Sequence, residues 1–68
     1  MSDAIFKKVE LVGTSETSIE DAVNNALAKA AQTVRNIRWF EVIETRGSVE
    51  EGKVGQWQVT LSIGFKLE

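Results

Sequence analysis

Apolar and polar residues alternate most regularly near the C-terminal end of the chain. Between Val54 and Leu67, apolar side chains fall on alternate positions from Trp57 onward. That is the pattern of a strand with one face turned to a core. The apolar face would consist of Trp57, Val59, Leu61, Ile63, Phe65 and Leu67, and the other face of Gln56, Gln58, Thr60, Ser62, Gly64 and Lys66. We expect this strand at the centre of a sheet, with a second face that is polar but mostly uncharged.

Two further segments show strand patterns. The segment from Ile5 to Val12 is rich in β-forming residues and is followed by Gly13, where we expect the strand to end. The segment from Arg38 to about Val49 is also predicted to be an extended strand. Alternation predicts Trp39, Glu41, Ile43 and Thr45 on one face and Phe40, Val42, Glu44 and Arg46 on the other. Gly47-Ser48 and Glu51-Gly52 are expected to form turns or bulges.

A helix is expected between the first two strands, because apolar residues recur there at helical spacing. The apolar stripe consists of Ile19, Ala22, Val23, Ala26, Leu27, Ala30 and Val34. Ser18 is the expected N-cap, with its hydroxyl accepting from the backbone N–H of Asp21. A helix of about 17 residues would be ~26 Å long and would end at a left-handed Asn36. Lys29 and Arg35 would then lie late in the helix and complement its dipole.

The order strand, helix, strand, strand predicts an α+β fold with two layers. We expect a β-α-β-β unit over residues 1–68 as a single domain. Its three-stranded antiparallel sheet would have the order 1-3-2, with the one helix on one face.

Composition adds an expectation of self-association. A chain of 68 residues buries only about 60% of the surface exposed by its unfolded form, so such a small domain is marginally stable alone. Small domains usually recruit disulfides, metals or oligomerisation. The chain has no Cys and no His, so association with copies of itself is the most plausible additional source of stability.

Charge and residue content argue against several functional classes. A formal net charge of −2 is unlike the basic patch of a nucleic-acid binder. No apolar run approaches the ~20 residues of a membrane span, and residues 1–8 lack the basic-then-apolar order of a signal peptide. We therefore expect a cytoplasmic protein without nucleic-acid or membrane partners. Without His or Cys, the usual nucleophile–base pairs cannot form, so we expect no enzyme.

The face opposite the helix carries the candidate site. Trp39 is expected there beside neutral hydrogen-bonding groups such as Gln58, which suits either a subunit interface or a planar polar ligand. A tryptophan at the start of a strand is more often a core or interface residue, so both interpretations stand at this point. Arg46, Lys29 and Arg35 are most simply solvated or dipole-complementing cations.

Four stretches of the chain resemble the dodecin family. They are residues 6–15 (FKKVELVGTS), the Ala-rich helix, residues 38–42 (RWFEV) and residues 58–65 (QVTLSIGF). The resemblance implies a hollow homododecamer that binds flavins in pairs on two-fold axes. It implies that Trp39 stacks on the flavin and that Gln58 hydrogen-bonds the isoalloxazine edge. Arg46 would assist, with Arg38 as a neighbouring contact.

The resemblance also implies what the protein does with its ligands. It points to sequestration and storage of riboflavin or flavin mononucleotide (FMN), with the indole quenching the bound flavin. Coenzyme A is a possible second ligand, with Lys7, Lys29, Arg35 and Lys66 as candidate contacts. The main alternative is a structural or interaction module in which Trp39 is only an interface residue. A flavoenzyme is the third hypothesis.

Overall fold

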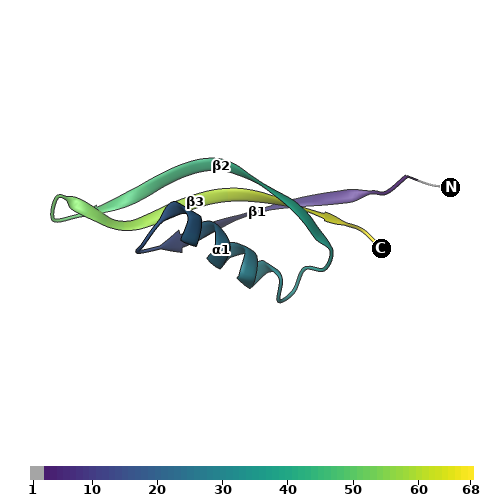
Figure 1. Ribbon diagram of the computed structural model, residues 1–68. Helices are drawn as coiled ribbons and strands as arrows, with labels where there is room; N and C mark the ends of the chain where they lie inside the picture. Colours follow the sequence, from purple (N-terminus) through teal and green to yellow (C-terminus); the bar gives the residue numbers. More distant parts are fainter. Residues whose placement is uncertain (1–2) are drawn as a thin grey trace.

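The computed structural model describes residues 3–68 and contains one helix and one sheet (Figure 1). The elements are β1 (Phe6–Ser15), α1 (Ile19–Ala30), β2 (Ile37–Glu50) and β3 (Lys53–Lys66). The strands pair antiparallel in the order β1-β3-β2. The β-α-β-β order and the 1-3-2 sheet predicted from the sequence are therefore confirmed.

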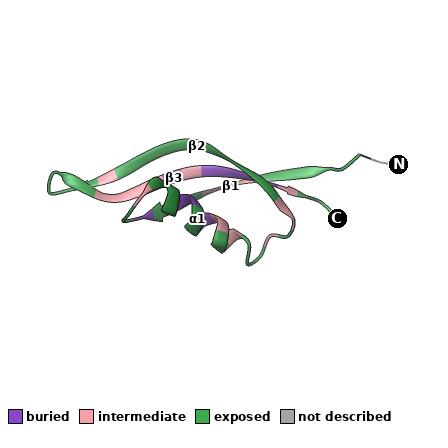
Figure 2. Ribbon diagram, in the orientation of Figure 1, coloured by how far each residue is buried: buried purple, intermediate pink, exposed green. Residues whose placement is uncertain are grey.

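The core lies between α1 and the apolar face of β3. Its buried side chains are Val59, Leu61 and Ile63 from β3 and Ala22, Val23 and Ala26 from α1. Figure 2 shows this buried stretch in the C-terminal half of β3, beside the helix. Burying a large aliphatic side chain stabilises the fold by about 1.5–3 kcal/mol. The alanines of the stripe have small side chains, which lets the helix lie close to the sheet.

Polar side chains fix the start of α1. The Ser18 hydroxyl accepts a 3.0 Å hydrogen bond from the Asp21 backbone N–H, as the sequence predicted. The Asp21 carboxylate accepts from the hydroxyls of Ser15 (2.7 Å) and Thr17 (3.2 Å) and from the Asn25 amide (3.4 Å). The hydrogen bonds from Ser15 and Thr17 are the main reason that the pKa of Asp21 lies below its ordinary value. They tie the first turn of the helix to the end of β1.

The predicted C-terminal end of the helix was wrong. α1 ends at Ala30, so its 12 residues span about 18 Å. The N–H groups of Gln32 and Thr33 bond the carbonyls three residues earlier, those of Lys29 and Ala30 (3.2 and 3.1 Å). Such tighter bonds close the last turn of a helix. The β-branched Thr33 favours helix less than the preceding alanines do.

The connection that follows changes the position of Arg35. Asn36 adopts the left-handed conformation expected of it, with φ of 63°, but six residues beyond the end of α1. Arg35 therefore lies in the connection to β2 and is exposed, rather than in the last turn of the helix. Lys29 alone is basic in that turn.

The first strand is longer than predicted because it continues through Gly13 to Ser15. Gly13 lies directly under the helix. A Cβ atom at this position would overlap the Ala22 carbonyl and the Ala26 side chain. Glycine at this position therefore permits the close approach of helix and strand, rather than ending the strand.

Irregularities in β2 change which side chains share a face. The pairing shifts between Val42, which is opposite Leu61, and Glu44, which is opposite Thr60, so Ile43 is an extra residue on β2. A bulge of this kind reverses the alternation beyond it. The predicted faces beyond Ile43 were therefore wrong.

Thr45 is opposite the buried Val59 and faces the helix side, whereas Arg46 is opposite Gln58 and shares the face of Trp39. A further shift lies between Ser48 and Val49, where a bulge was expected. The hairpin turn at Glu51-Gly52 has positive φ at both residues, 53° and 76°, as a two-residue hairpin requires.

The molecule is elongated. The β2–β3 hairpin extends well past the helix at the end opposite the two termini (Figure 1). The radius of gyration is 14.2 Å, against about 11 Å for a compact chain of this length. α1 packs against β1 and β3. Phe40 and Val42 of β2 lie on the helix side of the sheet, opposite the buried Ile63 and Leu61, but remain 47% and 43% exposed.

Candidate functional site

Trp39 packs against the sheet on the face opposite the helix. It pairs with Gly64 of β3, and a Cβ atom at Gly64 would overlap the indole ring. The Phe6 ring adjoins it, with centroids 5.1 Å apart and planes tilted by 59°. Trp39 nevertheless remains 40% exposed. The indole is thus an aromatic plate that is supported by the sheet from one side and accessible to a partner.

Gly64 and Phe6 support this plate, and the sequence analysis did not single them out. A glycine inside a regularly alternating strand indicates a bulge or the close approach of another group, and that signal was present at Gly64. Phe6 carries no comparable signal, because its contact with Trp39 depends on the sheet order.

The surroundings of Trp39 are more charged than the sequence suggested. Lys8 of β1 pairs with Gly64 from the other side. Its ammonium lies 3.7 Å from the carboxylate of Glu41, and both side chains are largely exposed. An exposed ion pair contributes little to stability. It does place charges of both signs beside the indole, whereas the neutral groups lie along β3.

A row of hydrogen-bonded side chains lies on the same face, near the hairpin. Arg46 Nε donates to Gln58 Oε1 at 2.6 Å, and Gln58 Nε2 donates to Gln56 Oε1 at 3.1 Å. Arg46 is exposed, whereas both glutamines are partly buried. The structure therefore brings together two predicted site residues, Arg46 and Gln58, and adds Gln56, which the sequence analysis assigned no role.

Trp39 and Gln58 do not meet within one subunit. Trp39 is opposite Gly64 and Arg46 is opposite Gln58, so the two parts of the predicted site lie six residues apart along β3. At the rise of an antiparallel strand this is about 20 Å, which is longer than three fused six-membered rings.

Arg38 lies directly before Trp39 and is exposed. The pairing shifts between Ile37 and Trp39, so Arg38 is the extra residue of a second irregularity in β2. Its expected role as a neighbouring flavin contact stays a prediction.

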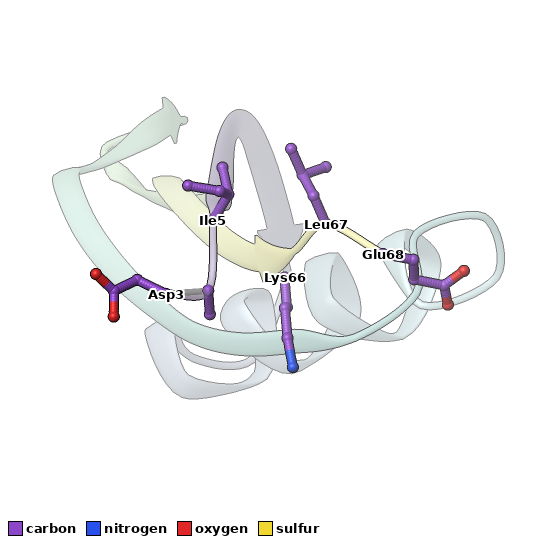
Figure 3. Close-up of a pocket in the computed structure, with 6 residues that line it drawn as sticks. Asp3, Ile5, Lys66, Leu67 and Glu68 are labelled. Carbon is purple, nitrogen blue, oxygen red and sulfur yellow. The ribbon is translucent and has the colours of Figure 1, made fainter. Parts of the chain in front are cut away.

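Three of the four cations expected to contact coenzyme A, namely Lys7, Arg35 and Lys66, lie toward the same end of the sheet. Lys7 and Ile37 both pair with Phe65, and the Lys66 N–H donates to the Asn36 carbonyl at 3.0 Å. Lys7 is opposite Phe65 and Lys66 is opposite Phe6, so these two lysines start from opposite faces of the sheet. Lys66 lines a hollow formed by the chain ends, with the carboxylates of Asp3 and Glu68 on either side of it (Figure 3). Lys29 lines a second hollow, between α1 and β1. Neither hollow is lined by Trp39, Arg46 or Gln58.

Within residues 3–68, no group of three or more Asp or Glu residues is arranged to hold a metal ion. In the same residues, no helix is long and apolar enough to cross a membrane.

Comparison with known proteins identifies one family. The sequence model of the dodecin family matches residues 5–68. The dodecin of Thermus thermophilus is 53% identical over 64 residues, which cover 94% of this chain and 93% of that protein. The calcium dodecin of Mycobacterium tuberculosis is 31% identical over 64 residues, covering 94% and 90%.

Solved structures of the T. thermophilus dodecin include variants in which one tryptophan or one of two arginines is replaced. They match this chain with TM-scores of 0.93–0.94 and identities of 50–52%, covering 97% of it and 97–98% of those chains. The replaced residues follow one another at intervals of seven and twenty positions. Trp39, Arg46 and Lys66 have the same spacing here, with lysine in the last position.

Proposed function

Because this chain belongs to the dodecin family, we propose that it binds flavin, as riboflavin or FMN, in a homododecamer and stores it. The observation that carries the proposal is Trp39, an indole that lies on Gly64 and keeps 40% of its surface exposed. A preformed, accessible aromatic plate on a rigid strand suits stacking of a planar heterocycle, and the ordering cost on binding is small.

The chemistry around the plate fits a flavin. Stacked or tilted aromatic pairs gain about 0.5–1.5 kcal/mol beyond the area they bury. The electron-rich indole quenches an excited isoalloxazine ring, which protects the flavin from photochemistry. The Gln58 amide has a donor and an acceptor for the ring edge. Arg46 and Arg38 offer positive charge to the phosphate if the ligand is FMN. Nothing in this set turns the flavin over, so the proposed role is sequestration.

The site is proposed to form between subunits. The separation of about 20 Å between the positions of Trp39 and Gln58 supports this arrangement, since they pair with β3 six residues apart. Exposed apolar side chains on β2 and an expanded radius of gyration support assembly. Coenzyme A remains a second candidate ligand. Because Lys29 lies apart on α1, and Lys7 and Lys66 start from opposite faces of the sheet, a coenzyme A site that uses all four cations, Arg35 included, would have to combine neighbouring subunits.

The proposal is tested by titrating the assembled protein with riboflavin and with FMN while following flavin fluorescence. We expect strong quenching by the unchanged protein and its loss in Trp39→Ala. Trp57→Phe is the control, because it removes the other tryptophan of the chain. Quenching that survives in Trp39→Ala would show that another residue stacks on the flavin.

The same titration separates the competing hypotheses. If the unchanged protein neither binds nor quenches flavin, Trp39 is an interface residue of a structural module. If bound flavin is reduced and reoxidised at enzymatic rates with common reductants and acceptors, the protein is a flavoenzyme.

A further inference from the structure

The hydrogen bonds from Arg46 through Gln58 to Gln56 run in one direction. A guanidinium group has donors and no acceptor, so the group that Gln58 turns toward Arg46 must be its amide oxygen. The Gln58 nitrogen then points toward Gln56. An amide nitrogen does not accept hydrogen bonds, so Gln56 must present its own oxygen to it. The 2.6 and 3.1 Å contacts have this order.

This chain of donors and acceptors removes a freedom that glutamine normally has. The terminal torsion of a glutamine is broad and roughly two-fold, so an isolated amide presents either its oxygen or its nitrogen in a given direction. Here the oxygen lies on the Arg46 side and the nitrogen on the Gln56 side. Each keeps one unused position, a lone pair on Oε1 and a hydrogen on Nε2, and these remain for a ligand.

We infer that Arg46 and Gln56 are positioning residues for the Gln58 amide, and that the fixed amide selects the register of the bound heterocycle edge. The inference rests on the proposed flavin site. The isoalloxazine edge carries carbonyl oxygens on either side of an N–H group, so an amide of fixed orientation pairs with it in one register. An amide held in its bound orientation before binding also costs less entropy when the ligand arrives.

The bulge in β2 makes this arrangement possible. Ile43 is the extra residue, and beyond it Arg46 is opposite Gln58 on the face of Trp39. In an unbroken alternation from Trp39, Arg46 would point to the other face. The bulge therefore acts on the site by directing one side chain, which is a common role of such irregularities.

Riboflavin is the probe, because it lacks a phosphate and any effect of Arg46 on its binding cannot come from a phosphate contact. We expect Arg46→Met and Gln58→Met each to raise the riboflavin dissociation constant of the assembled protein about three- to tenfold, the usual range for one hydrogen bond. The double variant should bind no more weakly than Gln58→Met, since Arg46 acts through Gln58. Lys53→Met, which removes an exposed lysine beside the hairpin turn, should bind like the unchanged protein.

Gln56 is tested by a conservative pair. Gln56→Met removes the acceptor oxygen and should weaken riboflavin binding. Gln56→Glu keeps an acceptor oxygen and should bind riboflavin like the unchanged protein. Each variant is first sized to establish that the assembly is intact. The inference would be overturned if the increases in the riboflavin dissociation constant caused by Arg46→Met and Gln58→Met multiplied in the double variant. It would also be overturned if all Gln56 variants bound riboflavin equally. Either result would leave the proposed flavin site in place. Failure of the unchanged protein to bind riboflavin would instead refute the proposed function itself.

Discussion

At the scale of single residues, the orientation of the proposed site depends on what lies beneath it. Trp39 rests on Gly64 because glycine leaves the backbone of β3 bare at that point. The Phe6 ring borders the indole. An exposed tryptophan without such support would sample several rotamers, and each would have to be restricted when a ligand binds.

Gly64→Ala tests this support. The added Cβ overlaps the indole, so the ring must leave its position, and overpacking of this kind typically costs about 1–3 kcal/mol. We expect flavin affinity to fall about tenfold or more, which a fluorescence titration measures. In a Trp39→Ala background the same change should have no further effect on binding.

Gly55→Ala is the matched control on the same strand. The three atoms nearest to its Cβ would all belong to the Glu50 side chain, which is exposed and can move away. If both glycine variants lost the same flavin affinity, the effect would come from a change in the strand backbone and not from displacement of the Trp39 ring.

At the scale of elements, the sequence predicted the features that a repeating pattern encodes. Alternation identified β3 as the central strand, and the apolar stripe with Ser18 located the start of α1. The helix end was missed because Val34 continues the apolar stripe although the backbone has already left the helix. The bulge at Ile43 was missed because an ordinary β-branched residue gives no signal of a shifted pairing. That one residue moved Arg46 to the site face. The residue pattern therefore suggested Trp39 and Gln58, Arg46 was predicted only through the family resemblance, and Gln56 was not predicted.

The network around Asp21 predicts how α1 responds to acid. Because the folded-state pKa is lowered, the ionised carboxylate stabilises the fold. That contribution is fully present above the unfolded aspartate value of 3.8 and is lost as pH falls through the folded-state pKa. We expect Asp21→Asn to be less stable than the unchanged protein at neutral pH, with the difference shrinking below pH 3.8.

Urea unfolding followed by circular dichroism at several pH values measures this difference, with the protein concentration held constant because assembly affects stability. Glu16→Gln, a neutralisation in the exposed loop before the helix, is the control. A difference between Asp21→Asn and the unchanged protein that stays constant down to the lowest pH would contradict the assigned role of the carboxylate.

At the scale of the whole molecule, the subunit is too extended to bury its own apolar surface. Its hairpin projects beyond the helix (Figure 1), and Phe40 and Val42 stay exposed on the face of β2 that corresponds to the core face of β3. Assembly would cover them. Assembly would also join the two halves of the proposed site, which one subunit holds about 20 Å apart.

Val42→Glu is therefore expected to disrupt the assembly and flavin binding together. It places a charge on a surface that we expect to be buried between subunits, where an unpaired charge is strongly unfavourable. Light scattering gives the mass and flavin fluorescence gives the binding. Glu16→Lys, a charge change in an exposed loop, should leave both intact. A dissociated Val42→Glu subunit that still binds flavin with the original affinity would contradict a site shared between subunits.

The most direct test of the shared site is complementation between a variant that does not quench, Trp39→Ala, and a variant that binds weakly, Gln58→Met. The two are mixed in equal amounts, dissociated and reassembled, and the riboflavin titration of the mixture is compared with that of each variant alone. If each flavin takes Trp39 from one subunit and Gln58 from another, random assembly gives both intact residues in about one quarter of the sites, one half times one half. We therefore expect about this fraction of the sites to bind and quench riboflavin with the affinity of the unchanged protein. A mixture in which no sites have that affinity would place both residues on one subunit and contradict a site shared between subunits.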